Sequence, residues 1–488
     1  MVKIGKYHEN IIFPFIKYKL WQKLGSLSQK VFLLNVGFLP LLFEVASERI
    51  KIISIMKTKM ILIGFPVLVM GFFLSTFSTD GTFSEARRTL QPLDGCVFMT
   101  VMGEQPSTDF DVYKTAENLN LSVRDGLSWL REAQLHNGGY GAGSHSAQHI
   151  KDPRAVKADP ATTSMVATAF LRSGNTLQKG NYSKNLEEAI NYLLETVENT
   201  SKNSRYITEV RGTQIQSKLG QNIDAVLTAQ FFSNLLGREL KGIDKKRVER
   251  CLDICISKIQ KGTDAQGRQG GAGWAGVLQS GLANSALESA QAVGADVDEE
   301  VLERSRDYQK GNYDDKTGAV STEDGAGIML YAVSGSVRAS AKEARKAKEA
   351  VNKAKREGKL KKDAPVSVAN LKKAGYSEAE ALEYNTSYKV YESAKQTAQQ
   401  EDVLNGFGNN GGEEFLSFLQ TGESLVVNGD KDWKKWYDDM SGRILKIQNA
   451  DGSWNGHHCI TSPVFCTATS LLLLTVENDI EFLRKVGE

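Results

Sequence analysis

The sequence predicts an all-α protein, an (α/α)6 toroid of six inner and six outer helices with one charged helical insertion. Three observations predict this fold. Helical patterns come in pairs, the first helix amphipathic and the second apolar all round. A unit made of a helix, a Gln, a Gly-aromatic turn and a second helix occurs three times. The 44 glycines against 9 prolines fit many tight turns between helices.

The clearest copy of this unit begins at Gln448. Asp451-Gly452 supplies a tight turn that carries Trp454. Ser462 then suits an N-cap, and Pro463 suits the first position of the next helix. The other two copies are centred on Tyr140 and Trp274. Recurrence at this scale indicates a repeat architecture.

At these residues the chain resembles the prenyltransferase and squalene-cyclase (squalene oxidase) repeat family, whose signature is a Gln followed by Gly-x-Trp or Gly-x-Tyr. The resemblance covers residues 118–480. It implies a terpenoid-cyclase-like toroid in which the end that carries the Gly-aromatic loops opens into a central ligand cavity. It also implies that the aromatic residue of each turn fixes that turn against the next outer helix.

The chain departs from the catalytic signatures of this family. Cyclases of the family need an Asp-x-Asp-Asp motif, and the nearest stretch, residues 296–299, stands before an outer helix, where acidic residues stabilise a helix start. Family members that transfer prenyl groups hold zinc on Asp, Cys and His, and no Asp-x-Cys pair lies in an inner helix of this chain.

Six helix pairs account for the repeat domain, and six pairs close a ring. In order, the expected pairs are 123–134 with 161–173, 186–198 with 223–236, 245–260 with 281–294, 299–309 with 323–333, a helix within 378–402 with 412–427, and 433–448 with 463–476. Residues 337–377 interrupt the count. Because 339–362 is rich in Ala, Lys, Glu and Arg, we expect a solvated helix with nothing to bury.

The N-terminal segments are typical of a targeting sequence. An unbroken apolar run, 61–74, follows Lys57 and Lys59, so 56–78 is expected to be a signal peptide or a membrane anchor. Residues 1–55 are expected to precede the true start, and 79–117 to form an irregular lead-in. The protein is therefore expected in the periplasm or cell envelope, with membrane association possible through 60–77.

Charge narrows the class of partner. The formal net charge is +2, yet residues 1–78 hold ten Lys/Arg and three Asp/Glu. The rest of the chain is therefore mildly acidic, which argues against a nucleic-acid partner. An unknown lipid, glycan or envelope protein is expected instead.

The candidate ligand-binding residues lie in loops that a closed ring gathers at one rim, beside the N-termini of the inner helices. Helix N-termini favour anions there. The candidates are Tyr140, His145, His149, Asp159, Trp274, Trp454, His457 and His458. Four of these positions have plainer interpretations: Asp159 before Pro160 suits an N-cap, and the three aromatic residues suit packing of their turns.

The strongest cluster on this rim is His457, His458 and Cys459 with Cys466. Imidazole and thiolate at short spacing suit zinc, so zinc is a possible cofactor. In an oxidising compartment a Cys459–Cys466 disulfide is the preferred interpretation. Cys251 and Cys255 share one helix face and are expected to pack in the core.

Three functions remain open on this basis. The first is a ligand- or partner-binding scaffold without a catalytic signature. The second is a metal-dependent terpenoid or prenyl-type enzyme that uses the His/Cys rim. The third is a polysaccharide lyase or glycosidase, which needs paired carboxylates in the cavity. The acidic residues available to it are Asp224, Glu288, Glu323, Asp324, Glu413, Glu414 and Glu423.

Overall fold

The computed structural model describes residues 118–238, 241–271, 273–407 and 411–488. The expectations for 1–55, 56–78 and 79–117 lie outside these residues. The described part of the chain is all-α, with three isolated β-bridges and no strand, as predicted. No helix in it is both long and apolar enough to cross a membrane.

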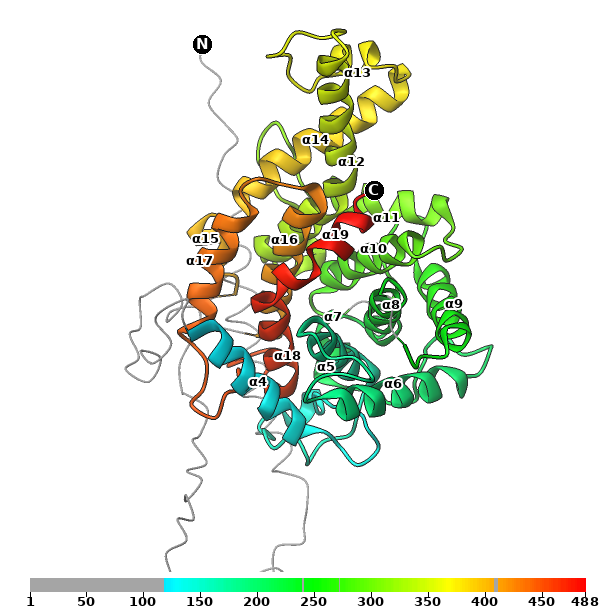
Figure 1. Cartoon of the computed structure of the whole chain (residues 1–488), viewed down its shortest axis with the longest axis vertical. Coiled ribbons are helices and arrows are strands. Elements are labelled where there is room, and N and C mark those ends of the chain that lie inside the picture. The colour runs from blue at the N-terminus through cyan, green and yellow to red at the C-terminus, as the bar shows by residue number, and fades with distance from the viewer. Residues whose placement is uncertain (1–117, 239–240, 272, 408–410) are drawn as a thin grey trace, which may run out of the picture. The chain divides into compact units, whose positions relative to one another are not determined.

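Six helices form a closed cycle of contacts (Figure 1). In chain order they are α5 (Pro160–Arg172), α8 (Ile223–Leu236), α10 (Gly276–Ala292), α12 (Met329–Arg356), α16 (Gly412–Asn428) and α18 (Pro463–Leu474). Each packs on the next, and α18 packs on α5. Neighbouring N-termini lie together, because Ala161 N donates to Asp224 Oδ1 (3.1 Å) and Asn222 N to Gln279 Oε1 (2.9 Å).

A second set of helices packs outside this cycle, each against one or two of its members. They are α4 (Leu119–Ala133), α6 (Ser183–Glu198), α9 (Lys245–Gly262), α11 (Glu299–Gly311), α14 (Glu378–Thr397) and α17 (Trp433–Leu445). Short helices α7 (Gln214–Leu219), α13 (Val368–Lys373), α15 (Glu401–Leu404) and α19 (Ile480–Val486) fill the connections.

The local sequence explains where these helices start and which face they bury. Asp159 caps α5 by accepting from Thr162 N (2.7 Å), and Ser462 caps α18 ahead of Pro463. Asp298 caps α11. These three predicted caps are confirmed. Helices of the inner cycle such as α10 are buried on all sides, whereas α6 and α9 bury a single stripe, which is the expected division of apolar residues.

The charged insertion is helical as expected, but the expectation that it has nothing to bury was wrong. The fourth inner helix begins at Met329, not at 323, and continues without a break to Arg356. Its outer half pairs with α14 as a long hairpin that extends beyond the other helices (Figure 1). Ala347, Val351 and Ala354 are buried in a separate apolar cluster with Leu371. Alanine is small enough to let two helices approach closely, so this face has a partner despite its lack of large apolar residues.

Candidate functional site

The aromatic residues of the three Gly-aromatic turns differ in exposure. Tyr140 and Trp454 are completely buried, whereas the Trp274 side chain is 42% exposed. Trp454 donates its indole N–H to the Ile444 carbonyl (3.0 Å), which ties its turn to α17. Tyr140 and Trp454 therefore hold their turns in place, as the plainer interpretation predicts, and only Trp274 is open to a ligand.

Trp274 belongs to a group of four side chains from separate segments, which we call the rim site: the exposed Trp274, Phe407 and His458, and the half-buried Lys218. Phe407 is 37% exposed. Its ring meets that of Trp274 edge-on at 5.2 Å and stacks on that of His458 at 5.5 Å. Lys218 Nζ lies 4.8 Å from the Trp274 ring centre. Exposed aromatic rings in contact are a feature of binding surfaces.

Helix α7 holds this arrangement in place. The backbone N–H groups of Trp274 and Ala275 donate to the carbonyls of Ser217 and Lys218 (3.3 and 2.7 Å). The loop that carries Trp274 therefore runs along the end of α7, and Lys218 comes to lie over the indole. The turn at Trp274 is thus fixed through its backbone, which leaves the side chain free.

A pair of buried carboxyl groups lies directly beneath the rim site. Glu413 and Glu414 open α16 and are almost fully buried. Glu414 accepts from the Tyr331 hydroxyl and from Phe407 N (3.4 Å), and Glu413 accepts from Ile460 N (3.1 Å). One oxygen of each, Glu413 Oε1 and Glu414 Oε2, has no hydrogen-bond partner.

Burial dominates the acid–base behaviour of this pair. It raises the pKa of Glu413 to about 7, and burial together with the charge of Glu413 raises the pKa of Glu414 to about 8. Gly411 precedes them because a methyl group there would meet Glu413 Oε2 at 2.6 Å. The site therefore holds a weak acid at neutral pH below its aromatic surface.

The four rim histidines, His145, His149, His457 and His458, are exposed. The loop before α5 and the loop before α18 are adjacent, as a closed ring predicts. Gln148 donates its side-chain N–H to the Cys459 carbonyl, and Lys151 Nζ donates to the Thr461 carbonyl (3.1 Å). Burial and the charge of Lys218 lower the pKa of both His145 and His458. Lys218 thus acts on imidazoles of both loops, and the charge of the adjacent His457 also lowers the pKa of His458. In the described residues no interaction joins His149 to the rim site.

The metal and disulfide predictions are not supported. The described residues contain no group of three or more His, Cys, Asp or Glu that could hold a metal ion, because His457 and His458 point from an exposed loop while Cys466 is buried in α18. Cys459 and Cys466 are free thiols, as are Cys251 and Cys255 in the core. The Cys466 thiol donates to the Ile460 carbonyl (3.5 Å) instead.

The loop residue Cys459 has an unusual backbone conformation. Its φ of 62° is left-handed, which is uncommon for a residue with a side chain. His458 Nδ1 lies 3.0 Å from its sulfur. Burial and the charge of Glu413 raise the pKa of this thiol to about 12. The thiol is therefore protonated at neutral pH and unsuited to act as a nucleophile.

A second buried acidic pair, Asp159 and Asp224, has a structural role. Asp159 accepts from Ala142 N (2.9 Å) and from Thr162, and Asp224 accepts from Gln216 Nε2 (2.7 Å). Burial raises their pKa values to about 6 and about 7. Their oxygens are engaged by helix starts, so the predicted N-cap interpretation of Asp159 is confirmed.

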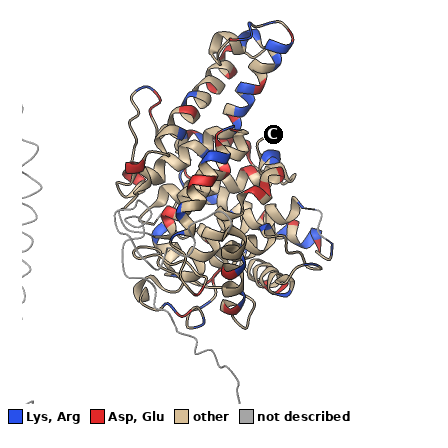
Figure 2. Ribbon diagram, turned by 60° about the vertical axis from the view of Figure 1, so that its left-hand side comes forward, with Lys and Arg blue, Asp and Glu red and all other residues tan. Residues whose placement is uncertain are grey.

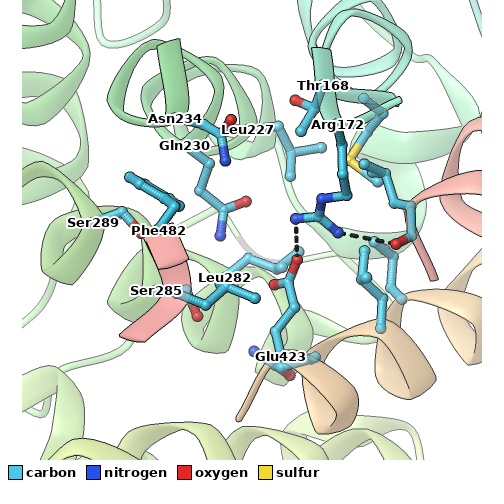
Figure 3. A pocket seen from close by; sticks show the side chains of 16 residues that line it. Thr168, Arg172, Leu227, Gln230, Asn234, Leu282, Ser285, Ser289, Glu423 and Phe482 are labelled. Carbon is cyan, nitrogen blue, oxygen red and sulfur yellow. Dashed lines mark hydrogen bonds and ion pairs between the residues drawn. The ribbon is translucent and has the colours of Figure 1, made fainter. Parts of the chain in front are cut away.

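The pocket inside the helix cycle lies at the opposite end from the one that the family resemblance implies. Its lining side chains come from the middle and C-terminal parts of α5, α8, α10 and α16, together with Leu472 of α18 and Phe482 and Leu483 of α19 (Figure 3). Arg172 points into it and pairs with Glu423 (2.6 Å), and Arg172 also pairs with buried Asp479 (2.6 Å). Its volume is only about 60 Å³. Sequence reasoning missed Arg172, because a basic residue in the last helical turn looks like ordinary C-terminal charge.

Three of the remaining acidic candidates, Glu288, Asp324 and Glu423, have ion-pair or hydrogen-bond partners, and Glu323 is exposed. Glu288 is buried between Arg306 (2.9 Å) and Arg338. Asp324 accepts from the Tyr308 hydroxyl (2.6 Å). Of the acidic residues considered for lyase or glycosidase chemistry, Glu413 and Glu414 are therefore the pair with unpartnered carboxyl oxygens.

No family model, no curated protein and no solved structure matches this chain.

Proposed function

We propose that the chain is an exported (α/α)6 toroid of the prenyltransferase and squalene-cyclase repeat type that binds a ligand or partner at the rim site and has no cyclase or prenyltransferase activity. The cyclic order of helix contacts supports the toroid, as do the three Gly-aromatic turns at 140, 274 and 454. The apolar run at 61–74 supports export. Fold alone does not carry the binding function.

The interior of the helix cycle is nearly filled, which favours binding at the rim site over a reaction inside the ring. Pockets for small molecules occupy roughly 300–1,000 Å³. The pocket between the inner helices has about 60 Å³ and holds the Arg172–Glu423 ion pair. A polyene or prenyl chain would have to displace this pair and the apolar side chains around it. A terpenoid reaction inside the ring is therefore disfavoured.

The contrast among the three turn aromatics is the observation that carries the proposal. Tyr140 and Trp454 are buried in equivalent turns, yet Trp274 is 42% exposed and touches Phe407, which is also exposed. Exposing these two rings to water has an unfavourable free energy that a bound ligand would remove. A chain that needed Trp274 only for its turn would bury it, as it does the other two.

The test uses the full chain and envelope material from the source cells, separated into polysaccharide, lipid and protein fractions. We expect one fraction to retain the protein. Trp274→Ala and Phe407→Ala should weaken retention at least about tenfold, which corresponds to ~1.4 kcal/mol. Leu121→Ala is the matched control, because Leu121 is 39% exposed against 37% for Phe407 and lies outside the rim site. Retention that is insensitive to both rim variants would contradict the proposal.

The buried carboxyl pair favours a second candidate, a polysaccharide-cleaving enzyme acting at the same rim. Glu414, with a pKa of about 8, would be the acid, and Glu413, with a pKa of about 7, would be its partner. Their side chains are buried beneath Phe407, so a substrate would have to move that ring. Release of reducing ends that disappears in Glu414→Gln would favour this candidate over simple binding.

A further inference from the structure

The end of the α12–α14 hairpin carries an unusual concentration of positive charge. Residues 353–373, which we call the basic tip, hold eight Lys/Arg and two Asp/Glu, while the whole chain has a formal net charge of only +2. The tip therefore has a net charge of +6 within 21 residues. Lys and Arg appear in blue along α12 toward its outer end in Figure 2. This charge is concentrated at the part of the ring protein that extends farthest from the helix cycle (Figure 1).

Most of these cations have no carboxylate partner. Two ion pairs form at the tip, Lys359 with Glu357 (2.9 Å) and Lys372 with Glu378 (3.2 Å). In the described residues no carboxylate lies within 4.0 Å of the other six cations. These six are Lys353, Lys355, Arg356, Lys361, Lys362 and Lys373. All but Lys355 are exposed, and Lys355 is half-buried.

Acidic residues at the start of α14 offset this charge only in part, because two of the three are engaged. Glu378 is the partner of Lys372, and Glu380 accepts from Ser377 in the cap of α14 (2.9 Å). Glu383 is the third. Like charges held together without partners repel one another, so the free energy of the tip falls when an anionic surface approaches it.

Apolar and aromatic side chains accompany the charge. Leu382, in the second turn of α14, is 58% exposed, the highest value among the exposed large apolar side chains of the described residues. Tyr376 and Tyr384 pack edge-on at 5.1 Å next to it in sequence. Lysines with an exposed Leu and tyrosines suit the interface of a bilayer, where lysines meet phosphates and the ring or alkyl groups enter the headgroup layer.

We propose that the basic tip docks the protein onto a lipid bilayer surface that carries anionic phospholipids. Each cation adds a similar, short-range attraction to such a surface, so the six unpaired side chains act together. A nucleic acid would meet the same charge, but Leu382 and the tyrosine pair have no role in a phosphate contact. This docking is independent of the rim site, which lies at the N-terminal ends of the inner helices.

The test measures binding of the full chain to vesicles of phosphatidylcholine mixed with phosphatidylglycerol, and to vesicles of phosphatidylcholine alone. Binding to the anionic vesicles should be stronger and should fall as salt rises, because the Debye length shortens. A variant with Lys353, Lys361, Lys362 and Lys373 changed to Gln should bind the anionic vesicles at least about tenfold more weakly. Leu382→Ala should weaken binding by a smaller factor at every salt concentration.

The matched control changes four exposed lysines outside the hairpin, Lys184, Lys246, Lys261 and Lys316, to Gln. It removes the same charge and should bind as the unchanged chain does. Equal loss in both variants would mean that net charge alone acts, and no loss in the tip variant would mean that another segment binds; either result overturns the proposal. A tip variant that loses affinity for labelled duplex DNA but keeps its affinity for vesicles would also overturn it.

Discussion

Lys218 Nζ lies 4.8 Å from the centre of the exposed Trp274 ring, and the two residues reach this position from different repeats. Lys218 lies in the last turn of α7, and Trp274 lies at the end of the loop that precedes α10 and donates hydrogen bonds to carbonyls of α7. A cation over an indole face is attracted by the ring quadrupole. The contact therefore holds a positive charge and an apolar surface side by side, so the ligand that we propose for the rim site would combine an apolar face with an anionic group.

The two tryptophans of the repeat turns should differ in their effect on stability. Trp454 is fully buried and hydrogen-bonded to Ile444, so Trp454→Ala should lower the free energy of unfolding by about 3–5 kcal/mol. Trp274→Ala removes a partly exposed side chain, so it should lower the free energy of unfolding by less than about 1 kcal/mol. Urea unfolding followed by circular dichroism measures both. Equal costs would mean that Trp274 also serves mainly to hold its turn.

The α12–α14 hairpin should be sensitive to the volume of its alanines. Ala347 is completely buried between the helices, so Ala347→Leu should overpack the contact and cost about 1–3 kcal/mol. Ala369→Leu on exposed α13 is the control and should be close to neutral. Thermal unfolding of the two variants decides the matter. An Ala347→Leu variant with unchanged stability would instead indicate that this part of α12 is a solvated helix, as the sequence predicts.

Much of the fold could be predicted from sequence, because the strongest signals are local. Caps such as Asp159 and Ser462, and the all-round apolar pattern of the inner helices, are set by neighbouring residues. The α12–α14 contact was missed because the residues that α12 buries there, such as Ala347, Val351 and Ala354, are small and stand between charged residues.

The rim site was found only in part. Trp274 and His458 were candidates, because the repeat and the histidine cluster mark them. Phe407 and Lys218 were missed, since no motif surrounds them and each reaches the site through tertiary contacts. Glu413 and Glu414 were among seven acidic candidates, and only burial and missing partners separate them from the others.

Stability should respond to pH through the buried acids. Burial raises the pKa of Asp159 to about 6 and of Asp224 to about 7, above the ordinary value of 3.8. The folded state therefore keeps protons that the unfolded chain releases above about pH 4. The stability that these groups contribute is complete below about pH 4 and is lost as the pH rises through about 6 to 7.

Asp224→Asn isolates this effect from the other titrating groups. Between about pH 4 and pH 7, the variant should lose less stability than the unchanged chain, by up to about 4 kcal/mol. Denaturant unfolding at several pH values measures the difference. Parallel curves for the two proteins would show that Asp224 ionises in the folded state as easily as in the unfolded one.

Cys459 and Cys466 should behave as thiols. In denaturant without reductant, both should react with iodoacetamide, as mass spectrometry of their peptides would show. In the folded protein Cys466 should react slowly, because burial raises its pKa and hides the sulfur. A requirement for reductant before labelling would instead show the disulfide that the spacing of these residues favoured.

The central claim is that a ligand covers Trp274, and iodide quenching of tryptophan fluorescence tests it most directly. The difference between the unchanged chain and Trp274→Phe isolates the emission of Trp274, which should be strongly quenched in the free protein. Adding the envelope fraction that retains the protein should protect this emission and leave the remaining tryptophans unaffected. Undiminished quenching of Trp274 in the bound protein would contradict the account and move the binding surface elsewhere on the chain.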